Sequence, residues 1–184
     1  CTDTNQNGFD DSEDLFIIDL YSQVDETEQV QIYNEIKASI SKTNGRISAF
    51  NCDSCLWINF IPSTVNLLSE LDSLIITNGN VGGTIPEEIG ELQNLDTIEL
   101  WNNNITGEIP ASIWSLPKLR KLYLARNNLT GSLNMINKPV SNIEQIWLGD
   151  NNLIDILPNH LFELESLWGL WIENNQFFGE LPEA

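Results

Sequence analysis

The chain has 184 residues, with 27 Asp and Glu against 8 Lys and Arg, which gives a formal net charge of −19 at pH 7. Nucleic acids and anionic membrane surfaces are bound by clustered basic residues, so this balance argues against both as partners. No apolar run approaches the roughly 18 residues that a membrane span needs. The charge instead favours neutral or cationic ligands.

The first 14 residues, CTDTNQNGFDDSED, place oxygen-bearing side chains at the spacing of a calcium-binding loop. Alternate oxygen ligands converge on one hard cation in such a loop, and Gly8 permits the sharp turn. The alternative is a solvated acidic tether, because Asn fills two ligand positions and Asp10 stands where an aliphatic residue is usual. Ca²⁺ is the one cofactor that the sequence suggests. The expected ligands are Asp3, Asn5, Asn7, Phe9 (through its backbone carbonyl), Asp11 and Asp14.

Residues 15–46 are predicted to be helical. Leu15, Phe16 and Ile18 have the spacing of a short amphipathic helix. A second helix is expected after a capping box formed by Asp25 and Glu28, and we expect Gly45 to end it. Its apolar positions are Val30, Ile32, Tyr33, Ile36 and Ile40. The pair is expected to cap the repeats that follow, since an open solenoid end exposes core and strand edge; the alternative is a partner-binding helix.

Residues 47–184 repeat with a fixed period. The pattern is clearest in the stretch LDTIELWNNNITGEIP at 95–110, and it recurs 24 positions later and 24 positions earlier. A period of this length with the pattern L-x-x-L-x-L-x-x-N is typical of a solenoid of stacked repeats. Six repeats begin at Ile47, Leu71, Leu95, Leu119, Ile143 and Leu167.

The extended pattern L-x-x-L-x-L-x-x-N-x-L-x-G-x-I-P resembles the plant-specific subtype of the leucine-rich-repeat family. That subtype occurs in plant receptor ectodomains and polygalacturonase inhibitors, and it has spread into bacterial surface proteins. The resemblance implies an α/β solenoid: a right-handed superhelix with a concave parallel β-sheet, short 3-10 or irregular convex segments and an N-terminal helical cap. It also implies recognition of a protein or peptide, with carbohydrate as the less common ligand.

We expect an extracellular or cell-surface location, and a disulfide would fit such an oxidising compartment. A chain that begins with Cys1 resembles a mature bacterial lipoprotein, whose first Cys carries the lipid; a cleavage site that happens to leave Cys first is the alternative. Cys52 and Cys55 fall on inward positions of the first repeat, so we expect two buried thiols or a short disulfide there. A lipid on Cys1 is the only membrane attachment that the sequence suggests.

The repeat pattern separates inward from outward side chains. Stacked Asn side chains are expected to satisfy the backbone groups that each turn buries. These residues are Asn103, Asn127, Asn151 and Asn175.

Four aromatic residues share the outward, concave face, where core packing does not explain them. Acids and amides beside them add hydrogen-bonding groups. The predicted ligand-binding residues are Glu99, Trp101, Asn102, Tyr123, Arg126, Trp147, Asp150, Trp168, Trp171 and Glu173.

Two ligands suit this face. A peptide or protein would use the aromatics as anchors while the acids select basic residues, and a glycan would stack its rings on them. A third hypothesis is a calcium-stiffened cell-surface adhesion protein. Catalysis is not expected, because the single His160 lies on a convex segment far from the acids and no nucleophile has a neighbouring base. The sequence leaves the oligomeric state open.

Overall fold

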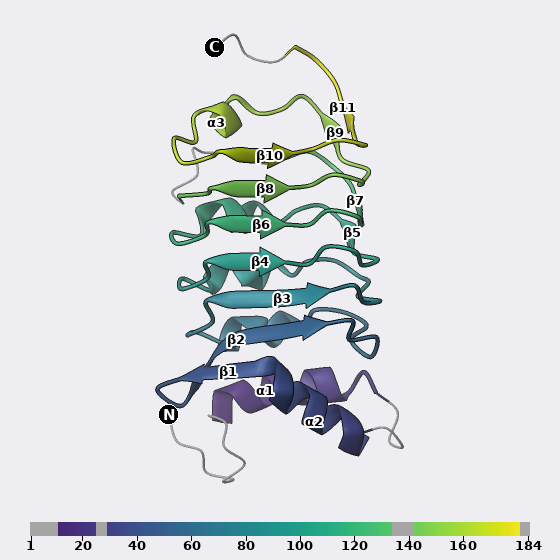
Figure 1. Cartoon of the computed structure of the whole chain (residues 1–184), viewed down its shortest axis with the longest axis vertical. Helices are drawn as coiled ribbons and strands as arrows, with labels where there is room; N and C mark the ends of the chain where they lie inside the picture. The colour runs from purple at the N-terminus through teal and green to yellow at the C-terminus, as the bar shows by residue number, and fades with distance from the viewer. Residues whose placement is uncertain (1–10, 25–28, 134–141, 181–184) are drawn as a thin grey trace.

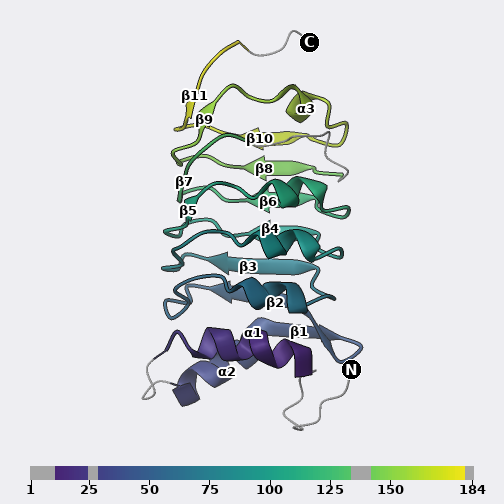
Figure 2. The same cartoon turned by 180° about the vertical axis from the view of Figure 1, so that it is seen from behind.

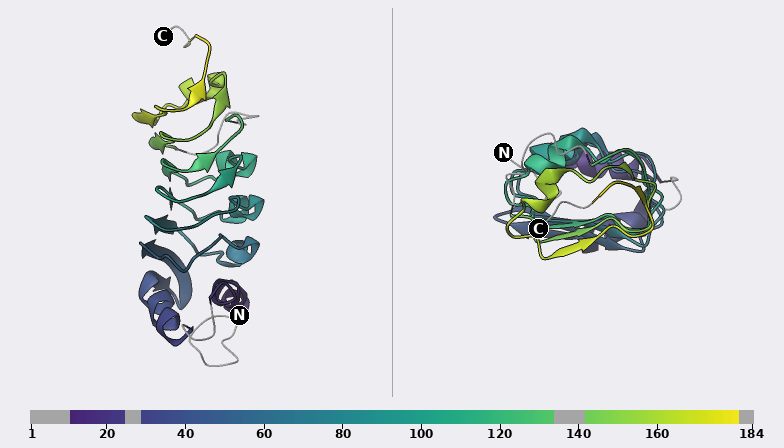
Figure 3. Two further views of the ribbon diagram at one scale, coloured as in Figure 1. Left: turned by 90° about the vertical axis from the view of Figure 1, so that its right-hand side faces the viewer. Right: turned by 90° about the horizontal axis from the view of Figure 1, so that it is seen from above.

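The computed structural model describes residues 11–24, 29–133 and 142–180. These residues form an elongated solenoid in which successive repeats stack along the long axis (Figures 1 and 2). The strands of the main sheet lie on one side, and short helices lie on the opposite side (Figure 3).

The main sheet has seven strands in the order β1-β2-β3-β4-β6-β8-β10, and all neighbours are parallel except β1 and β2. Its register shifts by one repeat per strand: Leu74 pairs with Ile98, which pairs with Leu122. The 24-residue period therefore aligns equivalent residues of successive strands into columns. The strands are β1 (Ile40–Thr43), β2 (Arg46–Asp53), β3 (Ser73–Thr77), β4 (Thr97–Glu99), β6 (Lys121–Tyr123), β8 (Gln145–Trp147) and β10 (Gly169–Trp171).

On the opposite side, each of four repeats has a short helix that begins directly after a proline. A proline presets the backbone φ angle for a helical turn and lacks the N–H group that a first turn leaves unpaired. These helices are the 3-10 helices η1 (Ser63–Leu67), η2 (Glu87–Glu91) and η3 (Ala111–Ser115) and the α-helix α3 (Asn159–Phe162). Two small parallel sheets join the sides and consist of β5 (Thr106–Gly107) with β7 (Asn128–Leu129) and β9 (Ile154–Asp155) with β11 (Gln176–Phe177).

The core between the two sides is mostly apolar, and the predicted asparagines bring polar side chains into it. The side-chain amide of Asn127 donates to the carbonyl oxygens of Leu100 (2.8 Å) and Leu124 (3.1 Å), and its Oδ1 accepts from the backbone N–H of Ile105 (3.0 Å). Asn103, Asn151 and Asn175 repeat this arrangement one repeat apart. Buried polar groups left unpaired cost about 1–3 kcal/mol each, so these bonds explain why Asn recurs.

Two helices cover the first repeat, α1 (Asp11–Tyr21) and α2 (Gln29–Ser39). The ring of Phe16 packs edge-on against Phe50, with 5.8 Å between centroids. The sequence prediction placed Leu15 and Ile18 on the packed face of α1, but both are exposed, while Phe16, Ile17 and Leu20 are buried. The apolar run LFII fits more than one helical face, and packing on the repeats selects one. The capping box of Asp25 and Glu28 lies outside the described residues.

The prediction that the second helix continues to Gly45 is wrong. The helix ends at Ser39, and Ile40 begins β1, which turns back onto β2 as an antiparallel hairpin. Asn44 and Gly45 have φ angles of 53° and 83° at the turn. An Asn-Gly pair readily adopts two positive φ angles, the geometry that a two-residue hairpin requires. The hairpin adds an antiparallel strand to the six parallel ones that the repeats predict.

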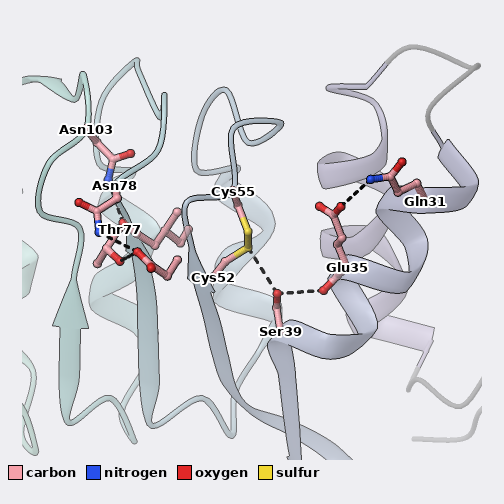
Figure 4. The surroundings of a disulfide bond; sticks show 10 residues. Gln31, Glu35, Ser39, Cys52, Cys55, Thr77, Asn78 and Asn103 are labelled. Atoms are coloured by element: carbon pink, nitrogen blue, oxygen red, sulfur yellow. Dashed lines mark hydrogen bonds between the residues drawn. A yellow bond between two sulfur atoms is a disulfide. The ribbon is translucent and has the colours of Figure 1, made fainter.

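Cys52 and Cys55 form a disulfide within the first repeat, which is one of the two predicted alternatives. Both residues are buried, and the Ser39 hydroxyl lies 3.4 Å from Cys52 Sγ and 2.9 Å from the Glu35 carbonyl oxygen (Figure 4). Cys1 lies outside the described residues, so its predicted lipid stays a prediction.

Buried Glu13 links α1 to the first strand of the repeats. Its Oε1 accepts from the backbone N–H of Ile47 (2.6 Å) and from Arg46 Nε (3.2 Å). A buried carboxylate needs such partners, because an unpaired buried charge is strongly destabilising. The predicted calcium loop includes this position. Its expected ligands Asp3, Asn5, Asn7 and Phe9 lie outside the described residues, while Asp11 and Asp14 lie in the first turns of α1.

Candidate ligand-binding site

The outward side of the main sheet, here called the sheet face, brings most of the predicted ligand-binding residues together. Strand pairing places Glu99 opposite Tyr123, Tyr123 opposite Trp147, and Trp147 opposite Trp171. These four residues therefore form one column across β4, β6, β8 and β10. Side chains alternate between the two faces of a strand, so the apolar neighbours Leu122 and Ile146 point the other way, into the core, where both are fully buried.

The aromatic rings of this column contact one another in sequence. Tyr123 stacks on Trp147 with a centroid distance of 4.5 Å and an interplanar angle of 19°. Trp147 meets Trp171 edge to face at 4.9 Å, and Trp171 meets Trp168 edge to face at 6.4 Å. Trp147 and Trp171 each remain 37% exposed and Trp168 68% exposed. An exposed aromatic cluster above a filled core is typical of a binding surface.

A hollow of about 300 Å³ opens beside this cluster, and we call it the tryptophan pocket. Three tryptophans from the repeats of β4, β8 and β10 form its apolar walls, and charged side chains from the strand ends complete it. Its lining residues are Trp101, Ala125, Arg126, Trp147, Gly149, Asp150, Trp171 and Glu173. This volume lies at the lower end of the range of small-ligand sites, about 300–1,000 Å³.

Two small residues create the hollow, and the sequence prediction did not include them in the site. Ala125 and Gly149 fall in the same outward column as Trp101 and Glu173, one repeat apart. A Cβ atom on Gly149 would lie 2.7 Å from the Glu173 carboxylate oxygen Oε1. Any larger residue at this position would therefore displace the carboxylate. Two small side chains between large ones are the sequence signal that would have predicted a depression there.

A second glycine, Gly169, lets the Trp171 ring of the pocket lie close to the backbone. A Cβ atom on Gly169 would lie 2.4 Å from Trp171 Cζ3, so the indole lies across the backbone of its own strand. Gly169 does not have a positive φ angle, so this close approach is what requires glycine at that position.

One residue shortly after the end of each of β4, β6, β8 and β10 has an unusual backbone conformation. Arg126 and Asp150 have φ angles of 56°, and Asn102 and Asn174 have φ angles of 57° and 55°. Each follows its strand by the same number of residues, where the chain turns away from the sheet. Asn and Asp tolerate this left-handed conformation better than other side chains do, which explains their frequency here.

Hydrogen bonds link some of these side chains. Asn174 Nδ2 donates to Asp150 Oδ1 (2.7 Å), and Arg126 Nε lies 3.6 Å from Asp150 Oδ2 with both side chains largely exposed. Asn102 Nδ2 donates to Asn78 Oδ1 (2.7 Å).

The phenol of Tyr123 stays protonated over an extended pH range. Its pKa is raised, first because packing under Trp147 desolvates the phenol and second because the negative charges of Glu99 and Glu144 oppose ionisation. The hydroxyl is therefore a hydrogen-bond donor at neutral pH.

Six of the ten predicted ligand-binding residues line the tryptophan pocket, and four lie outside its lining. Glu99 and Tyr123 continue the column toward the N-terminal half, and Trp168, directly before β10, contacts the ring of Trp171. Asn102 is exposed but belongs to the hydrogen-bonded row with Asn78.

A second hollow lies at the opposite ends of the strands. It has a volume of about 530 Å³, and Glu70, Asp72 and Asp96 contribute to its lining. Arg120 beside it bridges Asp96 (2.5 Å) and Glu144 (3.3 Å). This hollow is acidic and has no aromatic lining, so it lacks the anchors that the tryptophan pocket offers.

The described residues contain neither a metal-binding cluster nor a membrane-spanning helix. Within 11–24, 29–133 and 142–180, no three His, Cys, Asp or Glu side chains are grouped so as to hold a metal ion. None of the helices described there is long and apolar enough to cross a membrane. His160 contacts Glu163 (3.3 Å) on α3, away from the sheet face.

Residues 69–129 match the family model described as leucine rich repeat. PEPR1 in complex with AtPEP1 is similar over 76% of this chain and 20% of that chain, at 26% identity and a TM-score of 0.69. The Arabidopsis receptor kinase HAESA, in complex with the peptide hormone IDA and the co-receptor SERK1, is similar over 74% of this chain and 22% of that chain, at 31% identity and a TM-score of 0.65. This chain thus spans about a fifth of the length of those two proteins.

The leucine-rich-repeat ectodomain of the receptor kinase SOBIR1 from Arabidopsis thaliana has the same fold along nearly its whole length. It is similar over 86% of this chain and 98% of that chain, with a TM-score of 0.70 and 23% identity. No curated protein sequence matches. These similarities give no support to a bacterial lipoprotein. The family match, the 24-residue register and the shared fold together support a leucine-rich-repeat protein.

Proposed function

We propose that this chain is a non-enzymatic recognition module that binds a peptide or protein on the sheet face, with the tryptophan pocket as its centre. The observation that carries the proposal is the contact series of Tyr123, Trp147 and Trp171, which stays exposed above a core that is already filled. Aromatic side chains of this kind dominate the binding energy of many protein interfaces.

The comparisons support a peptide or protein ligand over other classes. Three similar structures are complexes: PEPR1 with AtPEP1, HAESA with the peptide hormone IDA, and the plant peptide hormone receptor RGFR1 with RGF2. An extracellular location suits such a module, and the buried disulfide of Cys52 and Cys55 fits an oxidising compartment.

A glycan is the alternative ligand that one specific observation favours. Trp168 is 68% exposed beside Trp171, and a sugar ring can stack on an exposed indole face of this kind. The purified chain should therefore be screened against a peptide library and a glycan array in parallel. Selective capture of peptides supports the proposal, and selective capture of glycans alone contradicts it.

The site itself is tested by replacing an aromatic residue. Trp171→Ala should reduce binding of captured peptides at least tenfold, because truncation of a central interface aromatic typically costs 2 kcal/mol or more. Phe162→Ala is the matched control, since Phe162 is an exposed aromatic on α3, on the opposite side of the solenoid. Equal binding by wild type and Trp171→Ala, with Phe162→Ala reducing it, would place the site elsewhere.

The calcium hypothesis has its own test. If the segment 1–14 binds Ca²⁺, calcium should raise the melting temperature, because a ligand of the native state stabilises it by about 2.7 kcal/mol at a hundredfold excess over Kd. Asp3→Ala should remove that shift. A calorimetric titration without heat, together with an unchanged melting temperature, would leave the acidic-tether interpretation.

A further inference from the structure

The carboxylate of Glu173 is the least satisfied charged group of the tryptophan pocket. It lines the pocket and lies close above Gly149, yet it has no hydrogen-bond or ion-pair partner among the described residues. Both of its oxygens are thus available to a ligand. The neighbouring carboxylate of Asp150 differs, because Asn174 already donates to one of its oxygens and Arg126 lies 3.6 Å from the other.

The charge around the pocket is negative on balance. Two carboxylates, Glu173 and Asp150, face one guanidinium, that of Arg126. Glu99 adds a further negative charge beside the aromatic column, and the whole chain carries a net charge of −19. An incoming cation is therefore attracted both at long range and at the pocket itself.

The aromatic walls of the pocket also favour a cation. The faces of tryptophan rings carry negative potential and attract cations, and Trp does so more strongly than Tyr or Phe. A guanidinium is flat and weakly hydrated, stacks on aromatic rings and forms two parallel hydrogen bonds to one carboxylate. Trp101, Trp147 and Trp171 supply such rings, and Glu173 supplies such a carboxylate in the same hollow.

We propose that the tryptophan pocket binds an arginine side chain of the peptide ligand, with its guanidinium against the indole rings and paired with Glu173. This inference rests on the proposed function and names the residue that anchors the ligand there. The volume of about 300 Å³ fits one side chain better than a folded segment. A neutral sugar would leave the charge of Glu173 unpaired.

The test uses small probes that differ only in charge. N-acetyl-arginine amide and its neutral isostere N-acetyl-citrulline amide are titrated into the whole chain, with tryptophan fluorescence and the indole N–H signals in NMR spectra as readouts. The arginine probe should bind about tenfold or more tightly than the citrulline probe, because hydrogen bonds to charged groups are the stronger ones. Its binding should also weaken as salt is added.

A charge-neutral variant tests the role of Glu173. Glu173→Gln keeps the size of an exposed side chain without partners, so the fold should be unchanged and the preference for arginine over citrulline should fall about tenfold. Glu165→Gln removes one exposed carboxylate outside the pocket and should change nothing. Equal binding of both probes to wild type, or an unchanged preference in Glu173→Gln, would overturn the inference.

The two proposals can fail separately. Library peptides that bind wild type and lose binding in Trp171→Ala, yet show no enrichment of arginine, contradict this inference and leave the proposed function intact. Library peptides that bind Trp171→Ala as well as wild type contradict the proposed function itself. Enrichment of arginine in peptides whose binding needs both Trp171 and Glu173 supports the two together.

Discussion

One outward column of the sheet has a carboxylate at each end, and the two carboxylates differ in their hydrogen-bond partners. At the N-terminal end, the Asp53 carboxylate accepts hydrogen bonds from Thr77 Oγ1 and Asn78 Nδ2, both at 2.7 Å. At the C-terminal end, the Glu173 carboxylate lines the tryptophan pocket without a partner among the described residues. Strand register places both residues at equivalent positions of their repeats, five repeats apart.

The difference shows where a solenoid leaves its sequence free. Inward positions carry buried apolar residues in successive repeats, and four of the six repeats make the same asparagine bonds, because every repeat must stack on the next. Outward side chains are not needed for this stacking, so their residue types can vary. The N-terminal half uses them to complete its own hydrogen bonds, whereas the C-terminal half exposes aromatic rings and a free acid.

The largest effect is expected from breaking the core that both halves share. Leu122 is fully buried between two repeats, so Leu122→Ala should lower the free energy of unfolding by about 2–5 kcal/mol. Urea denaturation followed by circular dichroism measures this loss. A change of less than about 1 kcal/mol would mean that the inward column is not the core.

A smaller and more local effect is expected from Gly169→Ala. The added Cβ would lie 2.4 Å from the Trp171 ring, so the indole must move while the strand remains. Peptide binding should fall, and the unfolding free energy should change little. Gly82→Ala is the control, because the nearest atom to its added Cβ is 3.7 Å away. Loss of binding in Gly82→Ala but not in Gly169→Ala would refute this role.

The smallest effect concerns Asp53. Hydrogen bonds from Asn78 and then from Thr77 hold the pKa of this carboxyl below its ordinary value. Because the folded-state pKa is the lower one, the stabilisation is present above the unfolded-state pKa and is lost as the pH falls through the folded-state pKa. NMR titration of the carboxyl carbons should find the pKa of Asp53 depressed, and Asn78→Ala should raise it. A pKa that Asn78→Ala leaves unchanged would contradict the assigned cause.

Much of this architecture could be predicted from the sequence, because the period fixes which residues align. The register, the asparagine bonds and the aromatic column all follow from counting 24 positions. The hairpin at Asn44 and Gly45 was missed, since the apolar spacing up to Ile40 continued the helical pattern and outweighed the turn signal.

The shape of the site was harder to predict than its composition. Nothing local in the sequence shows that the Trp171 ring folds over Gly169 or that Glu173 extends above Gly149. Both depend on contacts between side chains whose rotamers are selected by the neighbouring repeat. A column of residues and a depression beside it are therefore predictable, whereas the placement of the rings and of the carboxylate within the pocket depends on the folded structure.

The most direct test of the account is the double variant Trp147→Ala/Trp171→Ala, measured for unfolding free energy and for binding of the library peptides. We predict that binding is abolished while the unfolding free energy falls by far less than in Leu122→Ala, because both indoles lie outside the core. Retained peptide binding would contradict a ligand site on the sheet face. A loss of stability as large as that of Leu122→Ala would show that these rings are structural instead.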